Sequence, residues 1–230
     1  MRQRARSLQD KAYRAEELLK AAEAIALELG GVRHVTLAAV TERAGLHRTG
    51  VRRYYSSKEE LLLELAERGW GQWRDAVLAE VGDRTGLDPV QTAAVVSATL
   101  ASLPVFCDLL THASLHLEGD VDIERARRYK ANAFAAHDEI VRTLDHATDM
   151  TSSQLESLLA VAVLVAAGLW QASHPTPTLA SLYEQEPRWG HAALDFLPKL
   201  DSLLKASAIG SPQRRHRALA PPAELRSRHP

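Results

Sequence analysis

Hydrogen-bond donors gather between positions 47 and 54, a stretch that contains no acidic residue. Arginine can donate to guanine N7 and O6 together, and threonine can contact the thymine methyl group. Gly50 would let the backbone approach a ligand closely. We therefore predict a short helix whose first residues contact base edges in the major groove of DNA. The alternative is an ordinary helical hairpin with a solvated basic face. The candidate contacts are His47, Arg48, Thr49, Gly50, Arg52, Arg53 and Tyr54.

A second set of chemically capable side chains is spaced four residues apart: Asp108, His112 and His116. On a helix this spacing stacks one carboxylate and two imidazoles on a single face. Two histidines four residues apart can bind zinc or nickel, with the aspartate as a third ligand. The hypothesis is a divalent metal at this face, and no cofactor is otherwise required. The alternative is a partly exposed polar stripe.

A catalytic alternative comes from the pair His137-Asp138 with His112 upstream. All-α metal phosphohydrolases use a His-Asp pair with further His and Asp ligands, so the region of Asp108, His112 and His137 is a candidate. Adjacent side chains on a helix point about 100° apart, however, and nothing else completes the set. The chain also lacks a glycine-rich phosphate loop and a nucleophile elbow. The main expectation is therefore that the protein is not an enzyme.

The donor-rich segment follows a helical hairpin pattern. Leu37, Val40 and Ala44 form one apolar face of a short helix, and Leu46 and Val51 supply the apolar side of the next. Gly45 stands where the chain must turn sharply, which glycine tolerates. The pattern predicts a helix-turn-helix.

The rest of the chain predicts an all-α fold of about nine helices, with no strand pattern and no internal repeat. Asp88-Pro89 is a helix start, Asp122 is an N-cap, and residues 151–154 form a capping box. Besides the two motif helices, the predicted helices cover residues 10–29, 58–81, 88–103, 104–117, 122–148, 155–170 and 189–206.

Residues 10 to 70 resemble the N-terminal domain of the TetR family of transcriptional regulators. The matching positions are Thr36, Val40, Ala44-Gly45-Leu46, Tyr54-Tyr55 and residues 57–61, Ser-Lys-Glu-Glu-Leu. The resemblance implies phosphate contacts by Thr36, Tyr54 and Lys58. Thr36 and Lys58 also begin helices, where backbone amides favour an anion. Thr41, His47 and Arg52 depart from the family pattern, which leaves the operator sequence open.

Composition and charge agree with a DNA-binding head on a helical body. The chain has 230 residues and is 46% hydrophobic, enough for a substantial core. Residues 1–58 hold 12 Lys and Arg against 6 Asp and Glu, whereas residues 59–210 hold 11 against 22. Attraction for phosphate is thus concentrated at one end.

The expected domains are a basic flexible arm (1–9), a helix-turn-helix domain (10–57), a helical effector-binding and dimerisation domain (58–207) and a disordered Pro/Arg-rich tail (208–230). The single cysteine, Cys107, excludes an intrachain disulfide and fits a cytoplasmic location. The N-terminus has no apolar run typical of a signal peptide.

The helix at 155–170 is apolar almost all round, but shorter than the roughly 20 residues that a bilayer requires. We expect no membrane contact and a partner subunit as cover. A homodimer would bind a palindromic operator, since two half-sites raise affinity. The predicted interface residues are Leu155, Leu158, Leu159, Ala162, Val165, Leu169, Leu197, Leu200 and Leu204.

The resemblance also implies a small-molecule effector bound in the body, which changes the spacing of the two DNA-binding heads. Repression rather than activation rests on this analogy. Candidate pocket residues are Trp70, Trp73, Phe106, His112, His116, Phe134, His137 and Trp170. Aromatic residues at helical spacing are also common in protein cores, so a core role is the alternative.

Overall fold

The protein folds as nine α-helices in the part of the chain that the computed structural model describes, residues 2–47, 50–192 and 194–210. Those residues form no strand; their sole β-type pairing is an isolated parallel bridge between Leu87 and Thr148. The predicted all-α fold class is confirmed.

The α-helices are α1 (Arg2–Leu29), α2 (Leu37–Arg43), α3 (Lys58–Val81), α4 (Pro89–Ala101), α5 (Pro104–His112), α6 (Ile123–Ala147), α7 (Ser152–Ser173), α8 (Pro177–Gln185) and α9 (Phe196–Gly210). Three 3-10 segments connect them: η1 (Val32–His34), η2 (Val51–Arg53) and η4 (Pro187–Ala192). A five-residue π-helical segment, η3 (Ala113–Leu117), continues α5.

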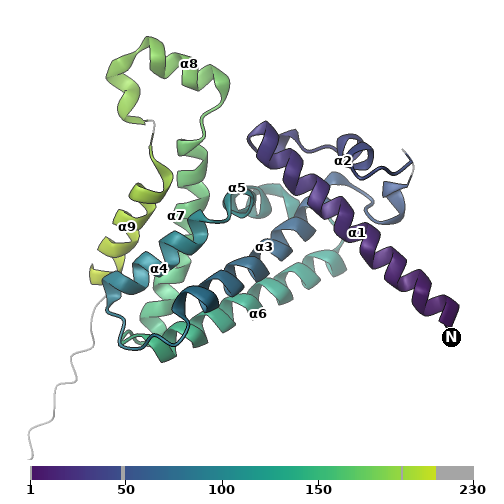
Figure 1. Cartoon of the computed structure of the whole chain (residues 1–230). Coiled ribbons are helices and arrows are strands. Elements are labelled where there is room, and N and C mark those ends of the chain that lie inside the picture. Colours follow the sequence, from purple (N-terminus) through teal and green to yellow (C-terminus); the bar gives the residue numbers. More distant parts are fainter. Residues whose placement is uncertain (1, 48–49, 193, 211–230) are drawn as a thin grey trace, which may run out of the picture.

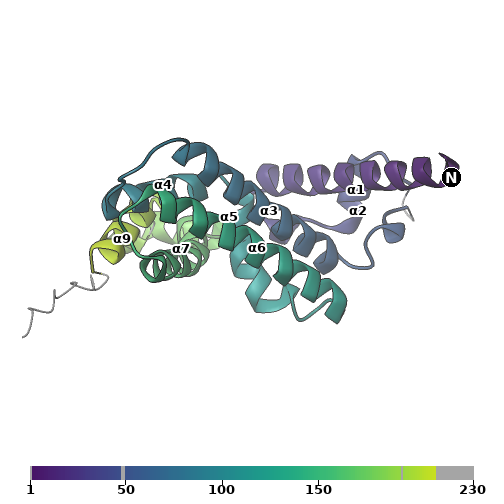
Figure 2. The same ribbon diagram turned by 90° about the horizontal axis from the view of Figure 1, so that it is seen from below.

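The molecule is elongated, with α1 and α2 at one end and α9 at the other (Figures 1 and 2). We call residues 2–57 the head and residues 58–210 the body. The long helices α3 and α6 pack along one another, and α9 packs on α4 and α7 at the far end of the body. The head therefore lies far from α9.

Side-chain caps begin several helices as the sequence predicts. Asp88 accepts from the backbone N–H of Gln91 at 2.8 Å, and the Gln91 side chain accepts from Asp88 N–H at 3.0 Å. Thr151 and Gln154 form the same reciprocal box. Each box satisfies amides that a helix N-terminus leaves without an intrahelical partner.

Two hydrophobic cores stabilise the fold. One lies inside the body, between α3, α4, α5, α6, α7 and α9. The other joins the buried faces of α1 and α2 to the start of α3, and it also contains Leu109, Leu117 and Tyr129 of the body. Because the second core contains residues of both head and body, the head is packed directly against the body rather than joined to it only by a linker.

Several predicted boundaries differ in the structure. Helix α1 begins at Arg2, so residues 2–9, which we predicted to be a flexible arm, are helical. The second motif helix appears, within the described residues, as the three-residue 3-10 segment η2. Helix α8 was not among the helices predicted from the sequence, and none of its side chains is buried.

The last helix starts at Phe196 rather than near Trp189. Pro198 then lies in its first turn, where proline is tolerated because that turn lacks intrahelical N–H bonds. The predicted tail beyond Gly210 lies outside the described residues.

Helix α7 is longer than predicted. At 22 residues, it is long and apolar enough by composition to cross a membrane, so our argument from insufficient length is wrong. Helix α4 and the stretch Pro104–Leu117, which is α5 with η3, meet the same test jointly, with an angle of 88° at the break. Helix α7 packs against α4, α5, α6 and α9, however, and its apolar face belongs to the body core.

Candidate functional site

The turn after α2 forms a Schellman motif at the predicted glycine. Gly45 has φ +64°, its N–H donates to Glu42 O at 3.0 Å, and Leu46 N–H donates to Thr41 O at 3.0 Å. A positive φ of this size is costly for residues other than glycine. The turn fixes the direction in which the chain leaves α2 toward the donor-rich segment.

Two threonines hold α2 in place. Thr36 is exposed and caps the helix, accepting from Ala39 N–H at 3.2 Å. Thr41 is 2% exposed and donates its hydroxyl to Leu37 O. The departure from the family pattern at Thr41 is thus accommodated, because the hydroxyl finds a partner within its own helix.

The start of α3 is capped by Ser57, whose hydroxyl accepts from Glu60 N–H at 3.1 Å. Lys58 follows as the first helical residue, and its ammonium group donates to Arg33 O at 3.2 Å. Lys58 therefore joins the start of the body to the loop between α1 and α2. A phosphate at this helix N-terminus would compete for the same ammonium group.

The described part of the donor-rich segment is open to solvent. His47, Arg52 and Arg53 are exposed, Gly50 and Tyr54 are half-buried, and Arg48 and Thr49 lie outside the described residues. A Cβ at Gly50 would lie 2.9 Å from His47 O, so the backbone is compact there. Tyr55 is 2% exposed and is therefore a core residue rather than a surface contact.

Not every arginine of the head is equally placed for an external anion. Arg43 forms two hydrogen bonds with the Glu28 carboxylate, and this pairing lowers the pKa of Glu28. Arg52 has a long 3.5 Å hydrogen bond to Ser56 O. Arg52 would therefore lose weaker interactions within the protein than Arg43 on binding DNA.

Asp108 connects the head with two body helices. Its Oδ2 accepts from the backbone N–H of Val32 at 2.7 Å, and its Oδ1 accepts from Gln171 Nε2 at 2.8 Å. The residue is 6% exposed, so both bonds are largely shielded from water. Sequence spacing offered no sign of this role, since the partners lie 76 and 63 positions away.

The predicted metal ligands are not assembled as a cluster. His112 Nε2 lies 3.7 Å from Asp108 Oδ1, and the His112 and His116 rings meet edge to face at 5.3 Å. Burial is the main cause that lowers the pKa of His112. Within the described ranges no group of three His, Cys, Asp or Glu side chains has the arrangement of a metal site. Binding of a metal by Asp108, His112 and His116 stays a prediction.

The predicted effector residues divide among three environments. Trp70, Phe134 and His137 line a cavity of about 270 Å³ together with Tyr129 and other residues of α6. Trp73 and Phe106 lie in the body core, where the Trp73 indole donates to Thr99 at 3.2 Å. Trp170 lines a different cavity, and neither cavity is lined by His112 or His116.

Phe134, one of the predicted pocket residues, is 62% exposed. The buried face of α6 includes Tyr129, Ala136 and Ile140. The Tyr129 hydroxyl accepts from the Trp70 indole at 3.2 Å, and burial raises the pKa of Tyr129 to about 12. The cavity therefore has a neutral hydroxyl at its wall at physiological pH.

Of the residues of the catalytic alternative, Asp108 and His112 are neighbours, but His137 lines another cavity. Asp108 lines the cavity beside α1, whereas His137 lines the 270 Å³ cavity between α3 and α6. His137 is paired instead with its neighbour Asp138 at 3.6 Å. The geometry does not bring the proposed phosphohydrolase ligands together.

Most of the predicted dimer-interface residues are core residues of the protomer. Leu155, Leu158, Leu159, Ala162, Leu169, Leu200 and Leu204 are all at most 7% exposed. They cannot face a partner, because the packing of α7 and α9 on each other and on α4 and α5 already covers them. Val165 is half-buried, and Leu197 is 44% exposed. Leu164, Leu203 and Ile209 of the same two helices are exposed instead.

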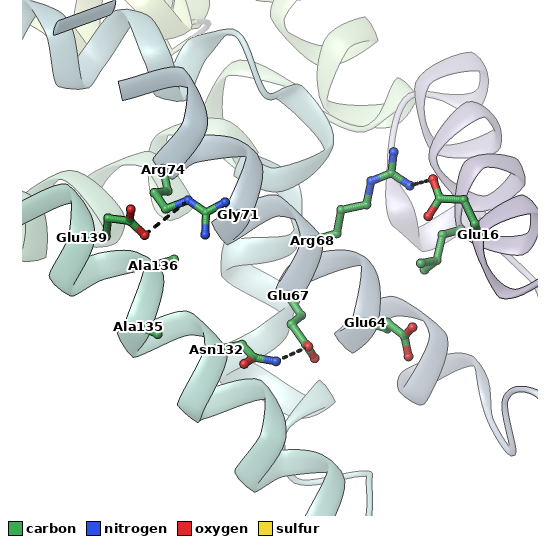
Figure 3. A pocket seen from close by; sticks show the side chains of 11 residues that line it. Glu16, Glu64, Glu67, Arg68, Gly71, Arg74, Asn132, Ala135, Ala136 and Glu139 are labelled. Atoms are coloured by element: carbon green, nitrogen blue, oxygen red, sulfur yellow. Dashed lines mark hydrogen bonds and ion pairs between the residues drawn. The ribbon is translucent and has the colours of Figure 1, made fainter. Parts of the chain in front are cut away.

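A polar cavity that the sequence analysis missed lies between α1, α3 and α6 (Figure 3). Its volume is about 410 Å³. Arg68 donates to Glu16 of α1 at 2.8 Å, and Arg74 lies 3.7 Å from Glu139 of α6. These ion pairs tie the head helix and α6 to α3. Each partner lies on a different helix, so no local pattern could have identified the cavity.

Comparison with known proteins adds independent findings. The family model described as bacterial regulatory proteins, tetR family, matches residues 18–65, and the model described as tetracyclin repressor-like, C-terminal domain, matches residues 67–215. No curated protein matches the sequence significantly.

Two solved structures resemble the fold. One is a TetR transcriptional regulator from Rhodococcus sp. RHA1, with TM-score 0.54, 15% identity, and coverage of 87% of this chain and 96% of that chain. The other is the transcriptional regulator FadR from Bacillus subtilis in complex with stearoyl-CoA, with TM-score 0.45, 14% identity, and coverage of 86% and 99%.

Proposed function

Because the chain belongs to the TetR family of bacterial regulatory proteins, we propose that it is a cytoplasmic repressor that binds a palindromic operator as a homodimer and is released by a small molecule. The observation that carries this proposal is the solvent-facing basic segment after the Gly45 turn. No catalytic step is part of the proposal.

Sequence-specific contact is assigned to the segment of residues 47–54. Arg48, Thr49 and Arg52 are the candidates for base edges, and His47, Gly50 and Arg53 lie among them. Thr36, Tyr54 and Lys58 are the candidates for phosphate contacts, which set the register of the head on the duplex. The exposure of Arg52 and the helix-start positions of Thr36 and Lys58 support this division.

The homodimer is proposed through the outer faces of α7 and α9. Leu164 of α7 is 74% exposed and Ile209 of α9 is 68% exposed, and Leu203 of α9 is exposed as well. Joining these faces across a two-fold axis would cover them and place two heads on one side of the assembly. A symmetric dimer of this kind matches a palindromic operator.

The effector is proposed to enter the cavity beside Trp70, Phe134 and His137. Its volume of about 270 Å³ is close to the lower end of small-molecule sites, which begin near 300 Å³. Its walls are mainly aromatic and aliphatic, with Lys130 and Asp138 at the rim. An apolar ligand with one or two polar groups fits this lining.

The test is a footprint on DNA flanking the chain's own gene, at two salt concentrations. We expect a protected palindrome that Arg52→Ala weakens by about ten-fold or more, as the loss of a bidentate arginine contact predicts. Arg142→Ala is the matched control, because Arg142 is exposed on the acidic body. Equal effects of the two variants, or salt-sensitive binding without a protected site, would reduce the interaction to backbone attraction.

A further inference from the structure

A small cavity of about 170 Å³ lies at the junction of head and body. The head contributes the end of α1 and the loop after it, and the body contributes the start of α5 and the end of α7. We call it the junction cavity. Its lining residues are Ala26, Leu27, Gly30, Gly31, Pro104, Val105, Asp108, Trp170 and His174.

The junction cavity combines mostly apolar walls with one buried carboxylate. Asp108 is the only Asp or Glu among the lining residues, and no Lys or Arg lines the cavity. The remaining titratable wall residue is His174, whose ring stacks on Trp170 at 3.8 Å between centroids. Asp108 is therefore the one acidic side chain in this wall with which a cationic group could pair.

The Asp108 carboxylate retains capacity for another donor. A carboxylate offers about four lone-pair sites, and Val32 N–H and Gln171 Nε2 occupy two of them at 2.7 and 2.8 Å. His112 Nε2 lies 3.7 Å from Oδ1, beyond hydrogen-bond distance. Gly31 allows the backbone after α1 to lie close to the Asp108 carboxylate, because a Cβ at Gly31 would lie 3.2 Å from Asp108 Oδ2. A buried carboxylate gains more from a cationic donor than an exposed one does, since water competes less.

The size of the cavity limits the ligand. An apolar cavity of about 150 Å³ in another protein holds benzene. A ring or short branched chain with one ammonium group therefore fits 170 Å³, whereas a long acyl chain or a nucleotide does not.

We propose that the junction cavity binds a small organic cation, a primary amine with an apolar body about the size of benzene. The ammonium group donates to Asp108, and the apolar body lies against Trp170 and Val105. This site is separate from the effector cavity beside Trp70, and its occupation can be measured without DNA.

The experiment is titration calorimetry of the full chain with benzylamine and with benzyl alcohol, at pH 7 and without DNA. The two probes have the same ring and differ in the charge of one group. We expect saturable binding of benzylamine at one site per chain and an affinity for benzyl alcohol that is at least about ten-fold lower, because the hydrogen bond to Asp108 is charge-assisted. Equal affinities, or no benzylamine binding, would overturn the proposal.

Two variants locate the site. Asp108→Asn keeps the shape of the side chain and is expected to lower benzylamine affinity about ten-fold or more. Asp138→Asn removes the same charge from the 270 Å³ cavity and is expected to leave the affinity unchanged. The reverse pattern would place the amine in the effector cavity and would contradict the junction site.

A third variant avoids the risk that Asp108→Asn perturbs folding. His174 is exposed, so His174→Ala should fold normally while opening one wall of the junction cavity. It is expected to weaken benzylamine binding several-fold. Unchanged binding in His174→Ala, together with binding insensitive to Asp108→Asn, would overturn the assignment even if the footprint establishes the repressor.

Discussion

Cys107 shows how burial changes the chemistry of a single residue. Its side chain is fully buried in the body core, and its sulfur lies 3.2 Å from Leu100 O. Burial, with a smaller contribution from the neighbouring Asp108 charge, raises the pKa of the Cys107 thiol to about 12. The thiolate is the reactive form of cysteine, so this residue is inert in the folded protein.

We therefore expect Cys107 to react with a thiol reagent at pH 8 orders of magnitude more slowly in the native protein than in denaturant, because reaction requires opening of the core. The measurement is the release of the reagent's chromophore with time. The control is Ala131→Cys in a Cys107→Ala background, since Ala131 is exposed on α6. Comparable native rates for the two proteins would contradict the buried, protonated thiol.

At the scale of helices, the crossing of α3 and α5 depends on a glycine. Gly69 is buried in α3, and a Cβ built there would lie 2.3 Å from Phe106 Cδ2. Gly71, two residues further along the same helix, would place a Cβ with nothing within 4 Å. The two glycines thus have the same helical backbone and opposite packing surroundings.

Gly69→Ala is expected to lower the free energy of unfolding by about 1–3 kcal/mol, because the new methyl group overpacks the contact with Phe106. Gly71→Ala is expected to raise it by about 0.5–1 kcal/mol, since alanine loses less conformational entropy in a helix. Denaturant melts of both variants test this. Two changes of the same sign would show that α3 and α5 do not cross as closely as described.

Local signals in the sequence were sufficient for much of the element structure. Asp88, Asp122 and Thr151 were identified as helix starts because a cap involves residues only two or three positions apart. The Gly45 turn was identified for the same reason. Contacts between distant segments could not be predicted in this way. The sequence indicated Asp108 only as a metal ligand beside His112 and His116. Its hydrogen bond with Val32 depends on how α5 packs against the head.

The exposed side of α7 could not be predicted from the sequence either. The sequence indicated that α7 is apolar on nearly every side, but an all-round apolar helix does not reveal which side the protomer itself covers. Only the packing of α7 on α5 and α9 separates the buried Leu158 and Leu159 from the exposed Leu164.

For the whole molecule, the separation of basic head and acidic body matters for how two copies meet DNA. The proposed dimer faces belong to α7 and α9, and α9 lies at the end of the molecule opposite α1 and α2 (Figure 1). A dimer through these faces leaves both heads free, and the acidic bodies would be repelled by phosphate. A monomer would contact only one half-site of the operator, so loss of the dimer is expected to weaken operator binding.

Leu164→Glu is expected to convert the dimer into a monomer and to weaken operator binding, because a charge would be buried in the proposed interface. The matched control is Leu115→Glu: Leu115 is 73% exposed on η3 and Leu164 is 74% exposed on α7. Light scattering after size-exclusion chromatography gives the mass of each variant. A dimer that survives Leu164→Glu would exclude this face as the interface.

The bond between Asp108 and the loop before α2 has a consequence for natural variation. Its donor is the main-chain N–H of Val32, which every amino acid except proline retains. Its acceptor is a side chain, which most substitutions at position 108 would remove. A random genetic screen for loss of this bond should therefore return many different replacements at position 108, but chiefly proline at position 32. The two ends of a single hydrogen bond would thus differ widely in their tolerance of mutation.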